Sequence, residues 1–545
     1  MKPAVQLTDQ KLRGGFYTPM ALVLHCLDRV SALNGHESME VLEPSAGDGA
    51  FIRGLLNHGI STSIENVVAV ELNQDEASRC ANEVSSAPFG ARVCAESFLE
   101  WFLSNDKEFE LAIGNPPFVR YQFIDETETK RIGEVGSQLG ISFRGVSNLW
   151  IPILLAALSR LKPAGTMAFV VPAELFTGVS AGVARSWLLA NFSDLRVDLF
   201  DSGSFPDVLQ EVIVVSGRRL RVSMAANAPT TIDFVDHCPF GQMAWRHRVA
   251  ISSSNWTRYL LDERQLEKVE IGRHLPGVLK LGDVAQIEVS TVTGANAFFS
   301  LSSAEVASWR LAEWTLPLLS RARHATGIEY STADHHEATR TSVKAWFLYF
   351  DSRLRDPIHD VFAAAYLAKG EHEELHRRYK TSIREPWYRV PLVRPGRLML
   401  SKRCHTFPRL ILNSAGVVTT DTVYQGNTLP ILGDCARDLV AGFHNSITLL
   451  DAELEGRSFG GGVLELVPSE IARISVPLVR GFASHFEELD VAYRRFSAGQ
   501  AEELEIIDRT NQELANTVAG LTKNLLTDLE ESRLLLQRRR LERNR

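Results

Sequence analysis

The amino-terminal part of the chain alternates short apolar runs with longer amphipathic segments. The apolar runs are rich in valine, isoleucine and alanine and lie at 41–42, 66–71, 109–114, 166–172 and 212–216. Between them, segments such as 149–161 place apolar residues three and four positions apart, which is the spacing of a helix packed on one face. Strands of this kind in alternation with helices predict a mostly parallel, doubly wound α/β sheet for residues 1–221.

The pattern changes after residue 221. Residues 222–275 are largely polar and are expected to form a connector. Residues 276–480 hold short strand-like pieces among prolines, glycines and tryptophans, which predicts a second domain of mixed α+β type. In residues 481–545, leucine and isoleucine recur at helical spacing among charges. This segment is expected to be a helical C-terminal tail of one or two long amphipathic helices that could pack on a partner chain.

Composition narrows the class of protein. The 545 residues carry a net charge of −8, with 45% hydrophobic and 23% charged residues, which is typical of globular domains. No run of about 18 apolar residues is present, so no membrane span is expected. The six cysteines include no Cys-x-x-Cys pair. This argues against a zinc site or a disulfide framework and favours the reducing cytoplasm.

The segment Glu43-Pro-Ser-Ala-Gly-Asp-Gly49 follows the first apolar run and precedes a helical pattern. Its two glycines permit a tight turn and close approach of a ligand, and the following helix offers free N–H groups. A second acid, Glu71, closes the next apolar run. Two carboxylates at strand ends suit a cationic ligand that carries a ribose, such as S-adenosylmethionine, better than they suit a phosphate. A plain strand–turn–helix with surface acids is the alternative.

A second candidate site, Asn115-Pro-Pro-Phe118, follows the apolar run at 109–114. In a doubly wound sheet the carboxyl ends of the strands face the ligand crevice. Pro116 and Pro117 fix the backbone and remove two N–H donors, so the Asn115 amide oxygen and the Pro116 carbonyl can both accept hydrogen bonds from one amino group. Phe118 offers a flat surface for a planar ring. A proline-stiffened loop that only caps a strand is the alternative.

These motifs, in their order along the chain, resemble those of the gamma class of N6-adenine DNA methyltransferases, the TaqI-like modification enzymes of type II restriction–modification systems. The shared segments are Gly15-Phe-Tyr-Thr-Pro19, Leu42–Phe51, Glu71, Gly114–Phe118, Ser147-Asn-Leu-Trp150, Leu161–Gly165, Phe169–Ala173 and Phe205-Pro206. The resemblance implies a Rossmann-like catalytic domain that transfers a methyl group from S-adenosylmethionine to N6 of a flipped adenine in duplex DNA. It also implies a DNA target-recognition domain, a partner restriction endonuclease acting on the same site, and a cytoplasmic, nucleoid-associated location.

The resemblance assigns roles to individual residues as well. Asn115 and Pro116 orient the target amine, while Phe118 and Phe205 stack on the two faces of the extruded adenine. The residues implied to bind the cofactor are Thr18, Glu43, Ala46, Gly47, Gly49, Glu71, Glu96 and Phe98. The acid–aromatic pair that reads the cofactor adenine is out of spacing by one residue here, which leaves Ser97 as an alternative to Glu96. Phe205 has a second interpretation, as a hydrophobic anchor ahead of a strand.

A run of cationic residues in the second domain indicates where DNA would bind. The candidates are Arg384, Arg389, Arg394, Arg397, Lys402 and Arg403, with aromatic residues between them. Such side chains neutralise phosphates, and a subset can reach base edges in the major groove. A solvated basic face unrelated to DNA is the alternative. The histidines show no metal-like cluster in the sequence, so no metal is expected.

Other functions use related features. Adenine in RNA and the glutamine side chain of a protein also present an –NH2 group to an Asn-Pro-Pro-aromatic motif. A DNA-specificity subunit with a catalytically silent methyltransferase fold would bind DNA without methyl transfer. The basic second domain and the Thr18-Pro19 motif favour DNA, and the intact Asn115–Phe118 motif speaks against a silent subunit.

Overall fold

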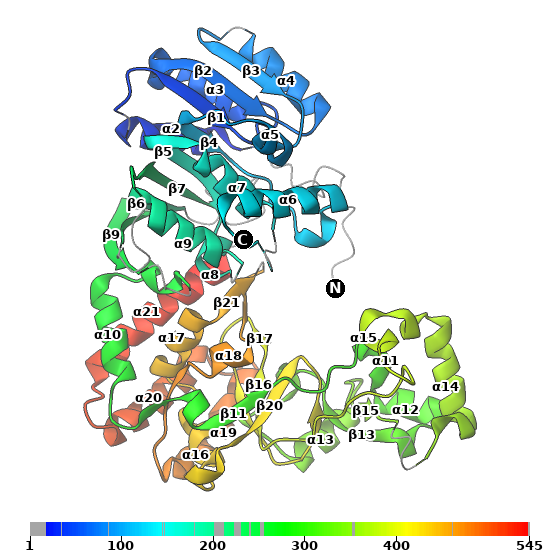
Figure 1. The fold of residues 1–545 in the computed structure, drawn as a ribbon. Coiled ribbons are helices and arrows are strands. Elements are labelled where there is room, and N and C mark those ends of the chain that lie inside the picture. The colour runs from blue at the N-terminus through cyan, green and yellow to red at the C-terminus, as the bar shows by residue number, and fades with distance from the viewer. Residues whose placement is uncertain are drawn as a thin grey trace. The chain divides into compact units, whose positions relative to one another are not determined.

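The computed structural model describes residues 18–542, apart from residues 34, 86, 144, 146–147, 179, 201–211, 223–229, 239–240, 251–254, 351–354 and 460. The chain divides into two compact units, Met1–Glu263 with Leu541–Arg545, and Arg264–Arg540 (Figure 1). Each unit is built around its own sheets and apolar core.

The first unit contains a nine-stranded sheet in the order β3-β2-β1-β4-β5-β7-β6-β8-β9. Its strands are β1 (Met39–Glu43), β2 (Ile64–Val70), β3 (Gly90–Cys94), β4 (Phe109–Gly114), β5 (Leu161–Pro172), β6 (Phe192–Phe200), β7 (Val212–Arg219), β8 (Thr230–Cys238) and β9 (Gly241–Val249). β1 to β5 run parallel, β7 lies antiparallel between β5 and β6, β8 is parallel to β6, and β9 is antiparallel to β8. The mostly parallel, doubly wound sheet expected from the sequence is confirmed.

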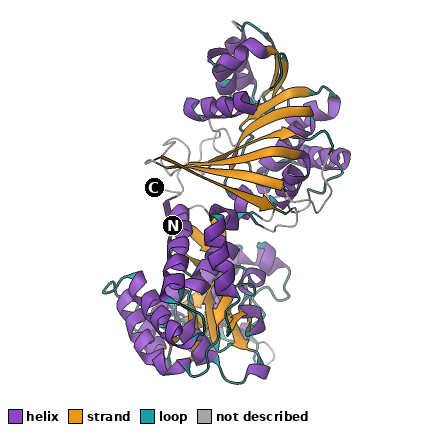
Figure 2. Cartoon of the chain, turned by 90° about the vertical axis from the view of Figure 1, so that its left-hand side faces the viewer, coloured by secondary structure: helices purple, strands orange, loops and turns teal. Residues whose placement is uncertain are grey.

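Helices cover both faces of this sheet (Figure 2). They are α2 (Met20–Leu33), α3 (Ala50–Asn57), α4 (Gln74–Val84), α5 (Phe98–Ser104), α6 (Glu126–Leu139), α7 (Trp150–Ser159), α8 (Glu174–Thr177) and α9 (Gly182–Asn191). α3 contacts both α2 and α4 in one layer, and α5, α6, α7 and α9 form another. The core between sheet and helices includes Leu27, Phe51, Leu111 and Val214, all buried. Burying each such side chain contributes about 1.5–3 kcal/mol.

The connector expected over 222–275 is wrong for residues 230–249. These residues form β8 and β9, which extend the sheet because the segment alternates apolar and polar positions with the period of a strand. Ile232 and Phe234 are fully buried, and the Phe234 ring stacks on Trp245 of β9 at 6.1 Å. The helix α10 (Glu263–Arg273) follows at the boundary between the units.

The second unit is of mixed α+β type, with sheets in the orders β10-β23, β11-β20-β16-β18-β14, β12-β15-β13-β19 and β17-β22-β21. Its strands are β10 (Val278–Lys280), β11 (Ala285–Glu288), β12 (Ser300–Leu301), β13 (Thr315–Leu319), β14 (Glu329–Tyr330), β15 (Trp346–Leu348), β16 (Leu398–Ser401), β17 (Arg403–Cys404), β18 (Leu410–Asn413), β19 (Val418–Thr419), β20 (Val423–Thr428), β21 (Arg457–Phe459), β22 (Val463–Glu465) and β23 (Ser475–Pro477). The sheet of five strands pairs β16 antiparallel with both β18 and β20.

Helices pack on these sheets around two apolar clusters. They are α11 (Asn296–Phe299), α12 (Ser303–Trp309), α13 (Thr332–Thr339), α14 (Val361–His372), α15 (Tyr379–Ser382), α16 (Ala436–Gly442), α17 (Ser446–Glu455), α18 (Pro468–Ile471), α19 (Phe486–Ser497), α20 (Glu503–Thr517) and α21 (Lys523–Glu542). One cluster is aromatic and includes Phe298, Phe347 and Tyr366, while the other includes Met399 and Ile411 from the five-stranded sheet.

The helical character expected for 481–545 is confirmed, but the helices α19, α20 and α21 pack on their own chain. The Arg533 side chain is 1% exposed and lies 2.8 Å from Glu503. Arg540 pairs with Glu453 of α17 at 2.6 Å, and both are buried. Charges that look solvated in the sequence are therefore satisfied internally, because each buried arginine has a carboxylate partner. Among the helices described, none has the length and apolar character needed to cross a membrane.

Candidate functional site

The carboxyl ends of β1, β2 and β4 bring three predicted polar side chains to one edge of the sheet. Glu43 ends β1, Glu71 follows β2 and Asn115 follows β4. β1 pairs in parallel with both β2 and β4, so these ends are adjacent. Gly114 lets the strands approach closely, because a Cβ atom there would lie 3.3 Å from Pro44 and 3.8 Å from the Glu43 side chain.

The glycine-rich turn after β1 is held by the next strand. Gly47 and Gly49 have φ angles of +53° and +85°, in the left-handed region that glycine adopts without strain. The Gly47 N–H donates to one carboxylate oxygen of Glu71 at 2.9 Å, and the Asn73 N–H donates to the other at 2.7 Å. Ala46, between the two strands, is buried. Each Glu71 oxygen retains a second lone pair, so this half-buried carboxylate can still accept bonds from ribose hydroxyls.

Glu43 is the most unusual acid of this edge. Its side chain is fully buried, and neither carboxylate oxygen has a hydrogen-bond partner. Burial, and then the negative charges of Glu71 and Asp48, raise the pKa of Glu43 well above its ordinary value. Burial also raises the pKa of Glu71. A buried carboxylate without a partner is costly, and a cationic group beside it would remove that cost. The carboxylates of Glu43 and Glu71 therefore fit a ligand with an ammonium or sulfonium centre and a ribose.

The Asn115 amide is oriented by its neighbours. Its Nδ2 donates to Thr18 Oγ1 at 3.1 Å, and the Ser45 hydroxyl donates to the Asn115 backbone carbonyl at 3.1 Å. With the nitrogen engaged, the Oδ1 atom is buried and has no partner. An amide oxygen held in this state is an acceptor ready for an amino group from outside the chain.

The residues after Asn115 form a stiff, half-buried segment. Pro116 is buried, Pro117 and Phe118 are half-buried, and the Phe118 ring packs against the core of the first unit. The Val119 N–H donates to the Pro117 carbonyl at 3.1 Å, which closes a tight turn. Phe205, expected to stack on the other face of the target base, lies outside the described residues.

The residues expected to contact the cofactor adenine have different environments in the structure. The Ser97 hydroxyl donates to Glu128 of α6 at 2.7 Å, so its proton is already used, whereas Glu96 lies half-buried in the loop after β3. Phe98 begins α5, is 5% exposed and stacks on Trp101 at 5.8 Å. One face of the Phe98 ring is therefore occupied by the protein itself.

Two residues of this region were not predicted to act in the site. Ser45 fixes the Asn115 carbonyl, as described above. Asn148 pairs with Arg120 in a backbone bridge close to Phe118, and its amide oxygen is buried without a partner. The only signals for them in the sequence are their places inside the Glu43-Pro-Ser and Ser147-Asn-Leu-Trp segments.

The expected DNA-binding cations fall into two groups in the second unit. Arg384 donates to the carbonyls of Thr293 and Val292, both at 2.7 Å, so it braces a loop. Arg397 pairs with Asp434 at 3.0 Å and Arg403 pairs with Glu465. Arg389 is exposed and also interacts within the chain.

Arg394 and Lys402 differ from these. Arg394 is exposed and Lys402 is half-buried, and within the described ranges neither side chain has a carboxylate or carbonyl partner. These two therefore have side chains available to a ligand. The other four include at least three that stabilise the unit itself, which the spacing of basic residues did not reveal.

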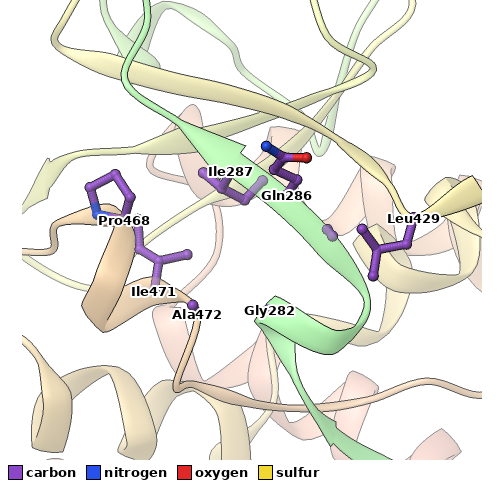
Figure 3. A pocket seen from close by; sticks show the side chains of 8 residues that line it. Gly282, Gln286, Ile287, Leu429, Pro468, Ile471 and Ala472 are labelled. Carbon is purple, nitrogen blue, oxygen red and sulfur yellow. The ribbon is translucent and has the colours of Figure 1, made fainter.

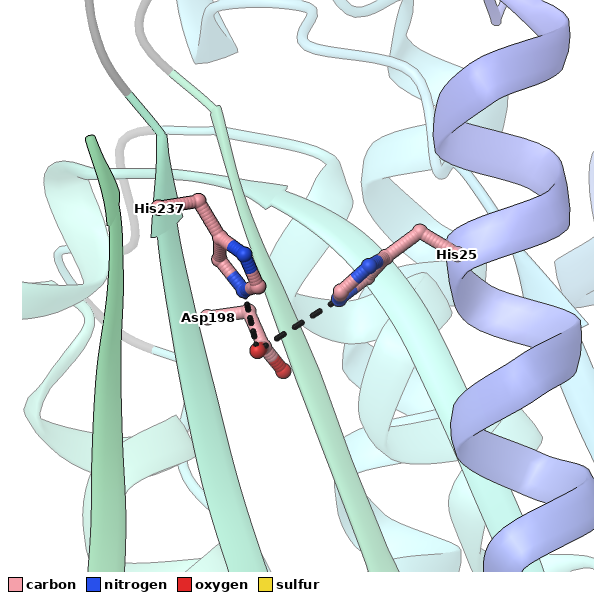
Figure 4. A group of neighbouring side chains, drawn as sticks. All are labelled: His25, Asp198 and His237. Carbon is pink, nitrogen blue, oxygen red and sulfur yellow. Dashed lines mark hydrogen bonds and ion pairs between the residues drawn. The ribbon is translucent and has the colours of Figure 1, made fainter. Parts of the chain in front are cut away.

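One cluster has the spacing of metal ligands. His25 of α2, Asp198 of β6 and His237 of β8 place three ligand atoms within 4.8 Å of one another, which the sequence did not suggest (Figure 4). Asp198 is fully buried and also accepts from Arg196, at 2.6 Å to Nη2. The Arg29 Nε atom lies 4.0 Å away. Two guanidinium groups around one carboxylate favour a network of ion pairs over a bound cation.

A cavity of about 270 Å³ lies in the second unit between β11 and α18 (Figure 3). Its lining is mostly apolar and includes Ile287, Leu429, Pro468, Ile471 and Ala472, with Gln286 as the polar side chain. No charged side chain lines it among the described residues, so it has no counterpart of the buried carboxylate of Glu43.

Both units match known families of restriction–modification methyltransferases. Residues 60–204 match the Eco57I restriction-modification methylase family, and residues 253–512 match the family of the type II methyltransferase M.Eco57I, C-terminal domain. The type II methyltransferase M.AccI of Acinetobacter calcoaceticus is 19% identical over 431 residues, 76% of this chain and 75% of that protein. M.XamI of Xanthomonas campestris pv. amaranthicola is 21% identical over 479 residues, 85% of each chain.

Other matches are partial. M.BanIII of Aneurinibacillus aneurinilyticus is 25% identical over 245 residues, and this match spans 41% of each chain. The crystal structure of the type IIG restriction endonuclease BpuSI aligns with 97% of this chain at 12% identity and a TM-score of 0.42, and the match spans 66% of the BpuSI chain. The two family matches, together with M.AccI and M.XamI, support a methyltransferase of a type II restriction–modification system.

Proposed function

We propose that this protein methylates N6 of adenine in duplex DNA, with S-adenosylmethionine as methyl donor. The observation that carries the proposal is the buried, unpartnered Oδ1 atom of Asn115 at the carboxyl end of β4, beside the buried, unpartnered carboxylate of Glu43. The first is an acceptor for an amino group, and the second is a partner for a cation. Their adjacency supports a reaction between an amine and a cationic methyl donor.

The cofactor would lie along the edge formed by β1, β2 and the glycine turn. S-adenosylmethionine supplies an electrophilic methyl group when it is bound. Glu43 would face its positive charge, and the Glu71 oxygens would accept hydrogen bonds from the ribose hydroxyls. Gly47 lies beside open space and leaves the turn free of a side chain there, whereas a Cβ atom on Gly49 would lie 3.3 Å from Cys80 of α4. Glu96 is the better candidate to accept from the adenine amino group, because its side chain is half-buried, whereas the Ser97 hydroxyl is buried and hydrogen-bonded to Glu128.

The target amine would be held by Asn115 and the Pro116 carbonyl. Two acceptors for the two N–H groups point the nitrogen lone pair away from the protein backbone and toward the methyl group. The nitrogen would take the methyl group that the bound cofactor supplies, and the bond from the methyl carbon to sulfur would break. The methylated amine would then lose one proton to solvent. Phe118 would stack on the base, at about 1–3 kcal/mol, against the few kcal/mol needed to flip it.

DNA would be held by the second unit. Arg394 and Lys402 have side chains free to meet phosphates or bases, and the unit matches the C-terminal domain family of a type II methyltransferase. We assign the catalytic role to the first unit and target recognition to the second. A restriction endonuclease that cleaves the same sequence is the partner expected for a modification enzyme.

The test is product analysis with the full-length protein. Labelled S-adenosylmethionine is incubated with duplex DNA, with RNA and with a glutamine-containing peptide, and the products are hydrolysed and identified. We expect label in N6-methyladenine from duplex DNA. Label in methylated RNA or in methylglutamine alone would contradict the proposal, as would label in a methylated cytosine.

A further inference from the structure

The backbone of the loop 391–397 in the second unit is fixed by hydrogen bonds, although the loop has no regular secondary structure. It precedes β16 and lies beside β20 and β18. The Val393 N–H donates to the buried Thr291 hydroxyl at 3.0 Å. The Arg397 N–H donates to Asn427 at 2.9 Å. The Asn413 amide donates to the Gly396 carbonyl at 2.9 Å. Side chains from three different segments thus fix the backbone of one short loop.

Gln425 of β20 is the centre of this arrangement. Its side chain is 2% exposed. Its amide nitrogen donates to the carbonyls of Val393 at 3.2 Å and Arg394 at 2.8 Å, and its amide oxygen accepts from the Gly396 N–H at 3.4 Å. A buried amide satisfied by three backbone groups of one loop is a rigid clamp, because losing any of these bonds leaves a polar group buried.

The backbones of the loop and β20 are also in close contact. A Cβ atom on Gly396 would lie 2.3 Å from the Gly426 carbonyl oxygen. Pro391 and Pro395 restrict the loop further, since proline fixes φ. The loop has little freedom to adapt to a ligand, so whatever it presents is presented in a fixed position.

The side chain it presents is that of Arg394. Its backbone carbonyl is held by Gln425 while its side chain is exposed, and within the described residues its guanidinium has no carboxylate or carbonyl partner. By contrast, the guanidinium of Arg397 in the same loop is paired with Asp434. A phosphate contact needs only a flexible positive charge. Reading the edge of a DNA base needs a guanidinium group that extends from a backbone held in one position.

We propose that Arg394 reads a guanine of the target sequence through its O6 and N7 atoms, and that Gln425 is the positioning residue that fixes it. The inference rests on the proposed function, because it assumes that the second unit recognises duplex DNA. It goes beyond that function by assigning base recognition to one side chain and its geometry to a buried clamp.

The test measures sequence preference by binding, separately from methylation. The full-length protein selects duplexes from a random pool, and the bound DNA is sequenced. For the wild type we expect a motif that contains a preferred guanine. Arg394→Ala and Arg394→Lys should each lower the preference at one guanine position by about 5- to 150-fold and leave the other positions unchanged. Arg340→Ala, which removes an exposed arginine that pairs with Glu337 of the preceding helix α13, is the matched control.

Gln425→Met should weaken the preference at the same position, and this effect should vanish in an Arg394→Ala background. A merely structural role would reduce the preference at all positions and would add to the effect of Arg394→Ala. Gln286→Met, an exposed glutamine on the neighbouring β11, is the control. A uniform loss of binding in Arg394→Ala with an unchanged motif would overturn the proposal, and so would the absence of any motif for the wild type. If the wild type selects a motif but adds no methyl group to adenine, the proposed function fails independently.

Discussion

The Asn115 Nδ2 atom donates a hydrogen bond to Thr18 Oγ1 at 3.1 Å, and this bond leaves Asn115 Oδ1 buried without a partner. The two residues are 97 positions apart in the chain, and the contact joins the segment before α2 to the end of β4. Thr18 therefore holds the Asn115 side chain in place. In the proposed reaction it would act through Asn115.

Replacing Thr18 with valine should lower the rate of methyl transfer by about 10- to 100-fold, because a loosely oriented amide misplaces the amine. Valine keeps the shape of threonine and loses the acceptor. Thr18→Ser keeps the hydroxyl and should retain most of the activity. Single-turnover kinetics with saturating cofactor would measure the step. Equal rates for the valine and serine variants would show that the hydrogen bond has no role in orienting Asn115.

Glu43→Gln should weaken S-adenosylmethionine binding by about 10- to 100-fold, the effect of losing a hydrogen-bonded charge. The same change should raise the thermal stability of the free protein at neutral pH. The reason is that the raised pKa of Glu43 makes its ionised form unfavourable when buried, so stability of the free protein falls as pH rises above the ordinary value of 4.5. Calorimetry and thermal unfolding without ligand would test the two effects, with Glu65→Gln, an exposed acid at the edge of β2, as control.

Binding of a cationic cofactor should release a proton from Glu43. Burial and the neighbouring acids keep this carboxyl protonated above pH 4.5, and a bound cation favours the ionised form. Affinity should therefore increase with pH in the wild type and change much less in Glu43→Gln. Titration calorimetry in buffers of different ionisation enthalpy counts the protons directly. Proton uptake, or no exchange, would contradict this role of Glu43.

Asp198→Asn should destabilise the first unit by about 3–5 kcal/mol, because it leaves the surrounding cations without their buried carboxylate. Burial alone would raise the pKa of Asp198, but hydrogen bonds from His237, His25 and Arg196 hold it well below its usual range. The stabilisation is therefore present above pH 3.8, the ordinary value, and is lost as pH falls. Denaturant unfolding at several pH values would show it. Asp233→Asn, an exposed acid paired with Arg246, is the control and should change stability little.

Much of the first unit could be predicted from local patterns in the sequence. The runs of β-branched residues, the glycine turn and the Asn115-Pro-Pro-Phe118 segment each act through neighbouring residues, so the sequence displays them directly. The parallel pairing of β1 with β2 and β4 then follows from the fold class, and it brings Glu43, Glu71 and Asn115 together.

The misjudged features depend on distant contacts. β8 and β9 contain charged residues, so their sequence resembles that of a polar connector. Two of these residues, Asp233 and Arg246, pair with each other on the sheet surface. Arg384 looked free until the structure showed the carbonyls of residues 292 and 293, about ninety positions away, as its partners. Thr18 lies in a recognised motif, yet its contact with Asn115 follows from the fold and not from spacing.

The central claim is that Asn115 Oδ1 accepts a hydrogen bond from the target amine. Its most direct test is methyl transfer by Asn115→Ala in the full-length protein, measured together with cofactor and DNA binding. We expect N6-methyladenine formation to be lost while both affinities stay within a few-fold of the wild type, because in the proposed reaction Oδ1 would contact only the reacting amine. Asn57→Ala, on the exposed end of α3, should behave like the wild type. Substantial N6-methyladenine formation by Asn115→Ala would show that the reaction does not depend on this acceptor.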